Sequence, residues 1–242
     1  MRYQYFVINR ERDKTRLEQL KNQFNKSGKA FTRVDAVDPH QITDGDYQRW
    51  VDVERNRRDY HHDLSSLQLA QYINHRRSWE MIVESGVDYG VVLEDDVILT
   101  DSFRVLANYI EAIDVPWNMI KLAEPFRPER KRQHHRFGAV TVVRYERVPR
   151  GCCAYAIKAD AARELLERSE KIFRPVDIDM QWWWEFGLNV IGLKPYPVQL
   201  SHRLGRDPAY AWTPPQRQQR ATVKWWQNAK FWWLNRQHPQ SN

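Results

Sequence analysis

The chain has 242 residues, 42% hydrophobic and 29% charged, which suits one sizeable α/β domain or a domain with a small appendage. No apolar run approaches the ~18 residues of a transmembrane helix, so the sequence predicts no membrane span. The net charge of +7 favours anionic partners, namely nucleotides, phosphorylated glycans, anionic lipid or nucleic acid.

The first half of the chain alternates between strand and helix patterns. The expected elements are a strand over 3–9, a helix ending near 27, a strand over 31–37, a polar surface excursion over 38–63, a helix over 64–85, a strand over 89–99, a helix over 102–113 and a strand over 118–122. The early charges of the first strand do not suit a signal peptide.

The second half continues the alternation and ends in a tail rich in tryptophan. We expect a basic loop over 124–136, strands over 139–145 and 152–157, a helix over 159–170, a short aromatic helix over 177–186, a strand over 189–193 and a basic helix from Pro214 to Arg236. The fold class is therefore α/β, with a mainly parallel sheet and helices on both faces. The adjacent Cys152 and Cys153 suit a reducing compartment, so we expect a cytoplasmic protein.

The third expected strand carries three consecutive carboxylates, Glu94, Asp95 and Asp96. Burying one unpaired carboxylate costs several kcal/mol, so the run needs a partner. A hard divalent cation with oxygen ligands, holding a diphosphate, would supply one. Strand alternation puts Glu94 and Asp96 on one face and Asp95 on the other. The alternative is an ordinary acidic turn after a core strand.

Five segments, in order along positions 3–200, carry a resemblance to a known family. They are Val7-Ile8-Asn9 with Arg12 and Arg16; Asn74-His75 before Trp79; Val92-Leu93-Glu94-Asp95-Asp96-Val97; Ala154-Tyr155-Ala156-Ile157 with Ala161; and Pro175-Val176-Asp177. Together they resemble glycosyltransferase family 25, which includes bacterial lipooligosaccharide galactosyltransferases. The chain departs from the family pattern at Ala70-Gln71 and Asn74-His75, usually Gly-Cys and Ser-His, and at Pro39, usually glycine.

The resemblance implies a GT-A-type, Rossmann-like domain over residues 1–213 that uses a nucleotide-sugar donor and Mn²⁺ or Mg²⁺. We expect an inverting transfer of a hexose, first of all from UDP-galactose, to a lipooligosaccharide or lipopolysaccharide glycan. UDP-glucose or another hexosyl donor stays open. A metal-dependent nuclease or phosphotransferase is the alternative from another class. A nucleic-acid binder is disfavoured, because binding alone would not place three acids near phosphate.

The acidic run supplies the expected metal and donor ligands. Asp96 is the first candidate for metal coordination, and Glu94 would bind the ribose, a metal-bound water or the metal itself. Asp95 is counted with the donor-binding residues, although structural hydrogen bonds or solvation are its favoured roles. His202, after the last strand, is a further metal or diphosphate candidate. His75 is a donor-site candidate whose alternative is a purely structural role.

Two further groups complete the expected site. Asn9, Arg12 and Arg16 follow the first strand, where nucleotide sites of open α/β sheets collect, and would meet the diphosphate or uracil. Asp177 or Asp179 would act as the general base that accepts the acceptor's proton. The alternative for Asp177 is to cap the aromatic helix. Within that helix Trp182, Trp183 and Trp184 cannot share one face, so one of them could stack on the acceptor.

The tail over residues 214–242 is expected to be an amphipathic helix. Its Trp225, Ala229, Trp232 and Trp233 fall on one broad face, and Lys224, Lys230 and Arg236 surround that face. This is the pattern of a helix that lies at the anionic inner-membrane surface. The alternative is a helix that packs on its own domain and buries the tryptophans.

Overall fold

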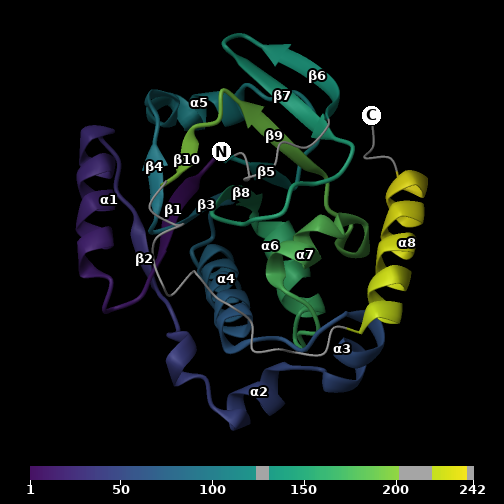
Figure 1. Cartoon of the computed structure of the whole chain (residues 1–242). Helices are drawn as coiled ribbons and strands as arrows, with labels where there is room; N and C mark the ends of the chain where they lie inside the picture. The colour runs from purple at the N-terminus through teal and green to yellow at the C-terminus, as the bar shows by residue number, and fades with distance from the viewer. Residues whose placement is uncertain (124–130, 202–219, 239–242) are drawn as a thin grey trace.

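The computed structural model describes residues 1–123, 131–201 and 220–238, shown in Figure 1. Its main sheet has eight strands, in the order β2 (Thr32–Asp35), β1 (Tyr3–Asn9), β3 (Tyr89–Glu94), β8 (Ala154–Lys158), β5 (Met119–Lys121), β9 (Val190–Lys194), β7 (Val140–Tyr145) and β6 (Lys131–Phe137). Strands β1, β2 and β3 are parallel, and β8 runs antiparallel between β3 and β5. The expected α/β class with a mixed, largely parallel sheet is confirmed.

Helices cover both faces of this sheet, as expected. The pleat directs Phe6 and Ile8 to a core built with α4 (Ser66–Glu84), α6 (Ala159–Arg168) and α7 (Val176–Gln181). It directs Tyr5 and Val7 to the opposite core, built with α1 (Lys14–Lys26) and α5 (Leu106–Glu111). The other elements are η1 (Pro39–Gln41), α2 (Asp44–Trp50), α3 (Val53–Asp59), β4 (Val97–Leu99), η2 (Asp101–Val105), η3 (Trp183–Phe186), β10 (Val198–Leu200) and α8 (Ala221–Gln237).

Helix α4 is the longest helix of the described chain, and its burial is unusual. It begins at a capping box in which the Ser65 hydroxyl accepts from the Gln68 N–H and the Gln68 side chain accepts from the Ser65 N–H. Its buried side chains include the polar Asn74, His75 and Arg76 besides the expected apolar ones. Buried polar groups on one helix need partners, and two of these three line the cavity described below.

Two expectations about the strands are wrong. The strand expected over 89–99 ends at Glu94, Asp95 and Asp96 form a turn, and β4 pairs with β10 instead of joining the main sheet. The basic loop expected over 124–136 is wrong in its second half, because Lys131–Phe137 form the edge strand β6. Residues 124–130 lie outside the described residues.

The expected C-terminal helix is present as α8. The domain boundary expected at residue 213 lies within 202–219, outside the described residues, and stays a prediction. Within the described ranges, no helix combines the length and the apolar character needed to cross a bilayer.

Candidate functional site

Chain topology brings polar residues from several segments to one edge of the sheet. The parallel strands β1, β3 and β5 end at this edge, and the antiparallel β8 begins there. The register pairs Ile8 with Glu94, and the Glu94 N–H donates to the Cys153 carbonyl at 2.8 Å. Ligand sites of open α/β sheets collect at such carboxyl ends.

Glu94 faces helix α4. One carboxylate oxygen, Oε1, accepts a hydrogen bond from the Gln71 amide at 3.1 Å and lies 3.4 Å from His75 Nε2. The Cys152 thiol lies 3.7 Å from the same oxygen. Burial alone would raise the pKa of Glu94, but the contacts with His75, Gln71 and Cys152 outweigh it and lower the pKa. Glu94 is therefore a carboxylate at neutral pH.

His75 is fully buried between β8 and Glu94. Its Nδ1 lies 2.9 Å from the Tyr155 hydroxyl, and Trp79 Nε1 donates a hydrogen bond to the same hydroxyl at 2.9 Å. Its Nε2 has no hydrogen-bond partner among the described residues. The structure therefore brings His75 into the predicted site, on the Glu94 side.

A possible metal cluster forms around this histidine. Ligand atoms of His75, Glu94 and Cys152 all lie within 4.8 Å of one another. A thiolate is a soft ligand that suits zinc rather than manganese, but burial and the nearby Glu94 raise the pKa of the Cys152 thiol and so disfavour the thiolate form. Sequence reasoning missed Cys152 as a candidate ligand, and no local signal places it beside Glu94, because the two residues are 58 positions apart.

Asp96 is buried in the turn after β3. Neither of its carboxylate oxygens has a hydrogen-bond partner in the part of the chain that the structure describes. Burial, with the nearby charges of Glu94 and Asp95, raises the pKa of Asp96 to about 7. Two oxygens without protein partners fit a hard, oxygen-coordinating cation such as Mn²⁺ or Mg²⁺. The Ser201 N–H donates to the Asp96 carbonyl at 3.0 Å, but the neighbouring His202 lies outside the described residues.

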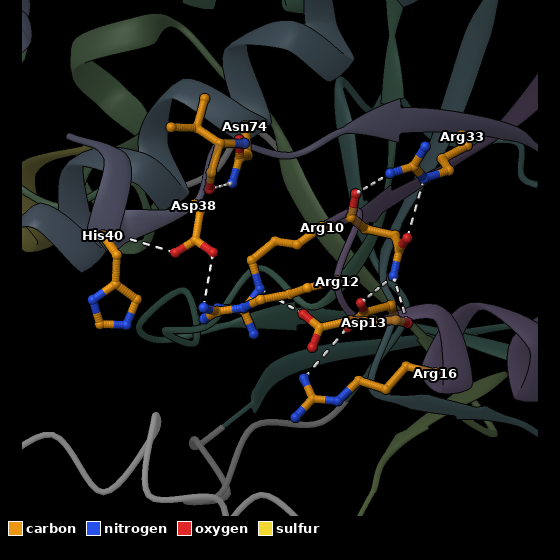
Figure 2. A network of polar contacts seen from close by, with 11 residues as sticks. Arg10, Arg12, Asp13, Arg16, Arg33, Asp38, His40 and Asn74 are labelled. Atoms are coloured by element: carbon orange, nitrogen blue, oxygen red, sulfur yellow. Dashed lines mark hydrogen bonds and ion pairs between the residues drawn. The ribbon is translucent and has the colours of Figure 1, made fainter.

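Asp95 points to the α1 side and is held by other site candidates. Asn9 Nδ2 donates to it at 2.6 Å, and an Arg16 nitrogen lies 3.6 Å away. Burial raises the pKa of Asp95 despite these two contacts. Arg12 instead reaches Asp38, at 2.9 Å, in the loop after β2, as Figure 2 shows. Asn9 and Arg16 therefore hold Asp95 in the acidic turn, which is the structural role favoured for Asp95 from the sequence. Arg12 instead connects the loop after β1 to the loop after β2.

A cavity opens over the ends of β1 and β3. Its polar lining includes Glu94 and Asp95. The other lining residues come from the end of β1 and the residue after it, from the β2–η1 loop and the start of η1, and from α4: Ile8, Arg10, Ala36, Val37, Pro39, Leu67, Ala70, Gln71, Asn74 and His75. Asn74 Oδ1 accepts from the Val37 N–H at 2.7 Å and so holds one wall in place. Sequence reasoning missed Arg10, Gln71 and Asn74. The signal for the last two was their spacing with His75, which places all three on one helix face.

The two candidate bases have different surroundings. Asp177 is the second residue of α7, whose N-cap is Pro175, so the alternative of a capping Asp177 is wrong. Burial raises the pKa of Asp177, and the positive charges of Arg150 and Lys121 partly oppose this. Asp179 is buried, with one oxygen accepting from the Tyr72 hydroxyl at 2.5 Å and the other paired with Arg174. The carboxylate of Asp179 is thus occupied by structural contacts.

Lys121 is a buried cation that sequence reasoning missed. It ends β5, is 2% exposed, and donates through Nζ to the Gly151 carbonyl. Burial lowers its pKa, while the nearby Cys152, Asp177 and Glu94 oppose this. The signal was a lysine at the carboxyl end of an apolar strand.

Comparisons with known proteins bear on this arrangement. The family model described as glycosyltransferase family 25 (LPS biosynthesis protein) matches residues 2–180, which contain every described site residue. None of the curated proteins compared is a significant match. Among solved structures, the crystal structure of A197 from STIV is 12% identical, with 79% of this chain and 81% of that chain covered and a TM-score of 0.36.

Proposed function

This chain belongs to glycosyltransferase family 25, the family of LPS biosynthesis proteins, and we propose that it transfers a hexose from a UDP-sugar to a lipooligosaccharide or lipopolysaccharide glycan. UDP-galactose is the first expected donor, with UDP-glucose or another hexosyl donor as the alternative. The observation that supports this most directly is the buried Asp96 carboxylate, which has no hydrogen-bond partner among the described residues and directly follows Glu94 and Asp95, two residues that line the cavity.

The cavity is the proposed site of the donor nucleoside. Its apolar walls, among them Ile8, Val37 and Pro39, suit the faces of a flat base. Glu94 and Gln71 supply an acceptor and a donor for ribose hydroxyls. Arg10 lines the same cavity and would pair with a phosphate oxygen.

Asp96, with Glu94, is the proposed holder of Mn²⁺ or Mg²⁺. A bound cation would neutralise charge on the departing diphosphate as a Lewis acid. Lys121, buried at the end of β5 and near Glu94 and Asp177, would add positive charge to the site.

Asp177 is the proposed general base, in preference to Asp179. It would accept the proton of the acceptor hydroxyl while that oxygen bonds to the anomeric carbon from the face opposite the diphosphate. The bond between the anomeric carbon and the diphosphate oxygen breaks, UDP leaves, and the configuration inverts. Asp179 is less suited because Tyr72 and Arg174 already occupy both of its oxygens. We place this reaction in the cytoplasm, at the inner-membrane surface.

The test is hydrolysis and transfer with a panel of nucleotide sugars, with Mn²⁺ or with chelator. We expect slow Mn²⁺-dependent release of UDP from one donor, lost in Asp96→Asn. The matched control is Asp101→Asn, the same change at an exposed carboxylate five positions away, which should keep full activity. Absence of UDP release from every donor, with lipooligosaccharide present, would contradict the proposal.

A further inference from the structure

Helix α8 is attached to the domain by one face. Phe231 is its one buried residue and packs against Trp182 and Trp184, with ring centroids 5.5 and 5.2 Å away. Gln227 Oε1 lies 2.9 Å from His61 Nδ1, and Asn235 Nδ2 donates to the Glu146 carbonyl at 2.6 Å. These contacts determine which side of the helix faces outward.

The outward side carries four tryptophans. Trp225, Trp226, Trp232 and Trp233 are 65%, 67%, 60% and 54% exposed. At 100° per residue they fall within about 120° of the helix surface, roughly opposite Phe231. Among the described residues they are four of the seven large hydrophobic side chains that are exposed, and the other three lie elsewhere. A gathered apolar patch of this kind marks an interaction surface.

The charges of the helix select the partner. Residues 221–238 contain Lys224, Lys230 and Arg236 and no acidic residue. The Arg236 guanidinium lies 4.1 Å from the Trp232 ring centroid, so cation and aromatic ring share one surface. Tryptophan concentrates at membrane–water interfaces, and cations beside it are attracted to anionic lipid headgroups. Lysine, in contrast, is depleted at protein–protein interfaces.

We propose that α8 docks the enzyme on an anionic lipid bilayer, lying along the surface with its four outward tryptophans at the depth of the headgroups. The docking deepens the proposed function, because the acceptor there is a lipid-linked glycan. The chain supports the connection: Phe231 packs on Trp182 and Trp184, and these directly follow α7, which carries Asp177. Docking through α8 would hold the acceptor side of the site at the membrane.

The test is co-sedimentation of the full chain with vesicles of phosphatidylglycerol and phosphatidylethanolamine, compared with phosphatidylcholine alone. We expect binding to the anionic vesicles that weakens with salt. Replacing all four outward tryptophans by serine should lower the partition coefficient at least about a hundredfold, because their apolar area stays in water. Circular dichroism checks that the variant keeps its fold.

A second pair of variants separates local charge from net charge. Neutralising Lys224, Lys230 and Arg236 to glutamine should weaken partitioning, by about fivefold for Arg236 at the outward Trp232 and by less for Lys230, whose Nζ lies 5.7 Å from the Trp182 ring centroid on the domain side. The matched control neutralises Lys14, Lys21 and Lys26, three exposed lysines of α1, which lies on the other side of the molecule from α8 in Figure 1. This control removes the same net charge and should bind nearly as well as the parent.

Three results would overturn the docking proposal. The first is that the parent chain does not bind anionic vesicles, and the second is that the tryptophan variant binds them as well as the parent does. The third is that light scattering finds a dimer of the parent chain and a monomer of the tryptophan variant. The last would assign the face to a second copy of the chain. UDP-sugar hydrolysis, measured without vesicles, should be equal in parent and variants. Its absence in the parent would contradict the proposed function and leave the docking result standing.

Discussion

Three carboxylates that are neighbours in sequence meet three different surroundings. Glu94 receives donors from α4, and its pKa is lowered despite burial. Asp95 is held by Asn9 and Arg16 on the other side of the sheet. Asp96 has no partner within the described ranges. The difference arises because β3 ends at Glu94 and the following turn redirects the next two side chains.

The isolation of Asp96 predicts an unusual stability effect. In chelator at pH 8, Asp96→Asn should raise the melting temperature, because it removes a buried charge that lacks a partner. The same variant should lose the rise that Mn²⁺ produces in the parent chain. Differential scanning fluorimetry measures both effects. A lower melting temperature in chelator would show that the Asp96 carboxylate is stabilised by protein contacts.

The different surroundings of Asp177 and Asp179 predict different defects. Asp177→Asn should lower kcat by about 10²–10⁴, because the base is lost while the fold is kept. Burial raises the pKa of Asp177, so in the parent kcat/KM should fall as pH drops through a value above the ordinary carboxyl range. Below that pH the base is protonated and inactive. Asp177→Asn should lack this acid limb, and an unchanged limb would exclude Asp177 as the base.

At the scale of elements, buried ion pairs and hydrogen bonds hold α7 against α4. Arg174, just before α7, pairs with Asp179 and Glu185, and Tyr72 of α4 donates to Asp179. The ion pair between Arg174 and Asp179 is almost fully excluded from water, because each of the two side chains is 4% exposed. This cluster positions the segment that carries Asp177.

Breaking the cluster should therefore destabilise the protein. Arg174→Met should cost about 3–5 kcal/mol of unfolding free energy, because it leaves the Asp179 charge buried without its cation. Tyr72→Phe should cost about 1–3 kcal/mol. Urea denaturation followed by circular dichroism measures both. The matched control is Arg168→Met, whose pair with Glu164 is exposed and should contribute under about 0.5 kcal/mol.

At the scale of the whole molecule, the proposed reaction lies on the face of the sheet that α4, α6 and α7 cover. The cavity proposed for the donor lies over β1 and β3 beside α4. The proposed base Asp177 belongs to α7, and α8 packs through Phe231 on Trp182 and Trp184, which follow α7. Figure 1 shows α1 and α8 on opposite sides of the molecule. The donor and the acceptor would then meet on the face of the sheet that α4 and α7 share.

This arrangement predicts joint binding of nucleotide and metal. UDP should raise the unfolding free energy much more with Mn²⁺ than with chelator. With Mn²⁺ present, the rise should be about 2.7 kcal/mol when UDP is at a hundred times its Kd. UMP, which lacks the diphosphate, should stabilise to the same small extent under both conditions. Thermal denaturation titrations measure the difference. Equal stabilisation by UDP in Mn²⁺ and in chelator would show that UDP binds independently of the metal.

Much of the fold was predictable because its signals are local. Apolar spacing of two or of three to four residues identified β1, β2, α4, β8 and α6 within a few positions, and it identified the C-terminal end of α8. The acidic run after an apolar strand, with the resemblance around it, pointed to the sheet edge and to the family that matches residues 2–180. These features depend on neighbours along the chain, so the sequence by itself determined them.

The partners of each side chain depend on long-range pairing, which only the tertiary structure decided. Strand β8 inserts between β3 and β5, and this brings Cys152 and Lys121 to the acidic run from 58 and 27 positions away. The Tyr72 hydroxyl donates to Asp179 from 107 positions away, and this contact gives Asp179 a structural role that Asp177 does not have. Phe231, not a tryptophan, faces the domain, which turns the four exposed rings of α8 outward. Local periodicity contains no information about which distant segments meet, because that choice comes from burying whole faces against one another.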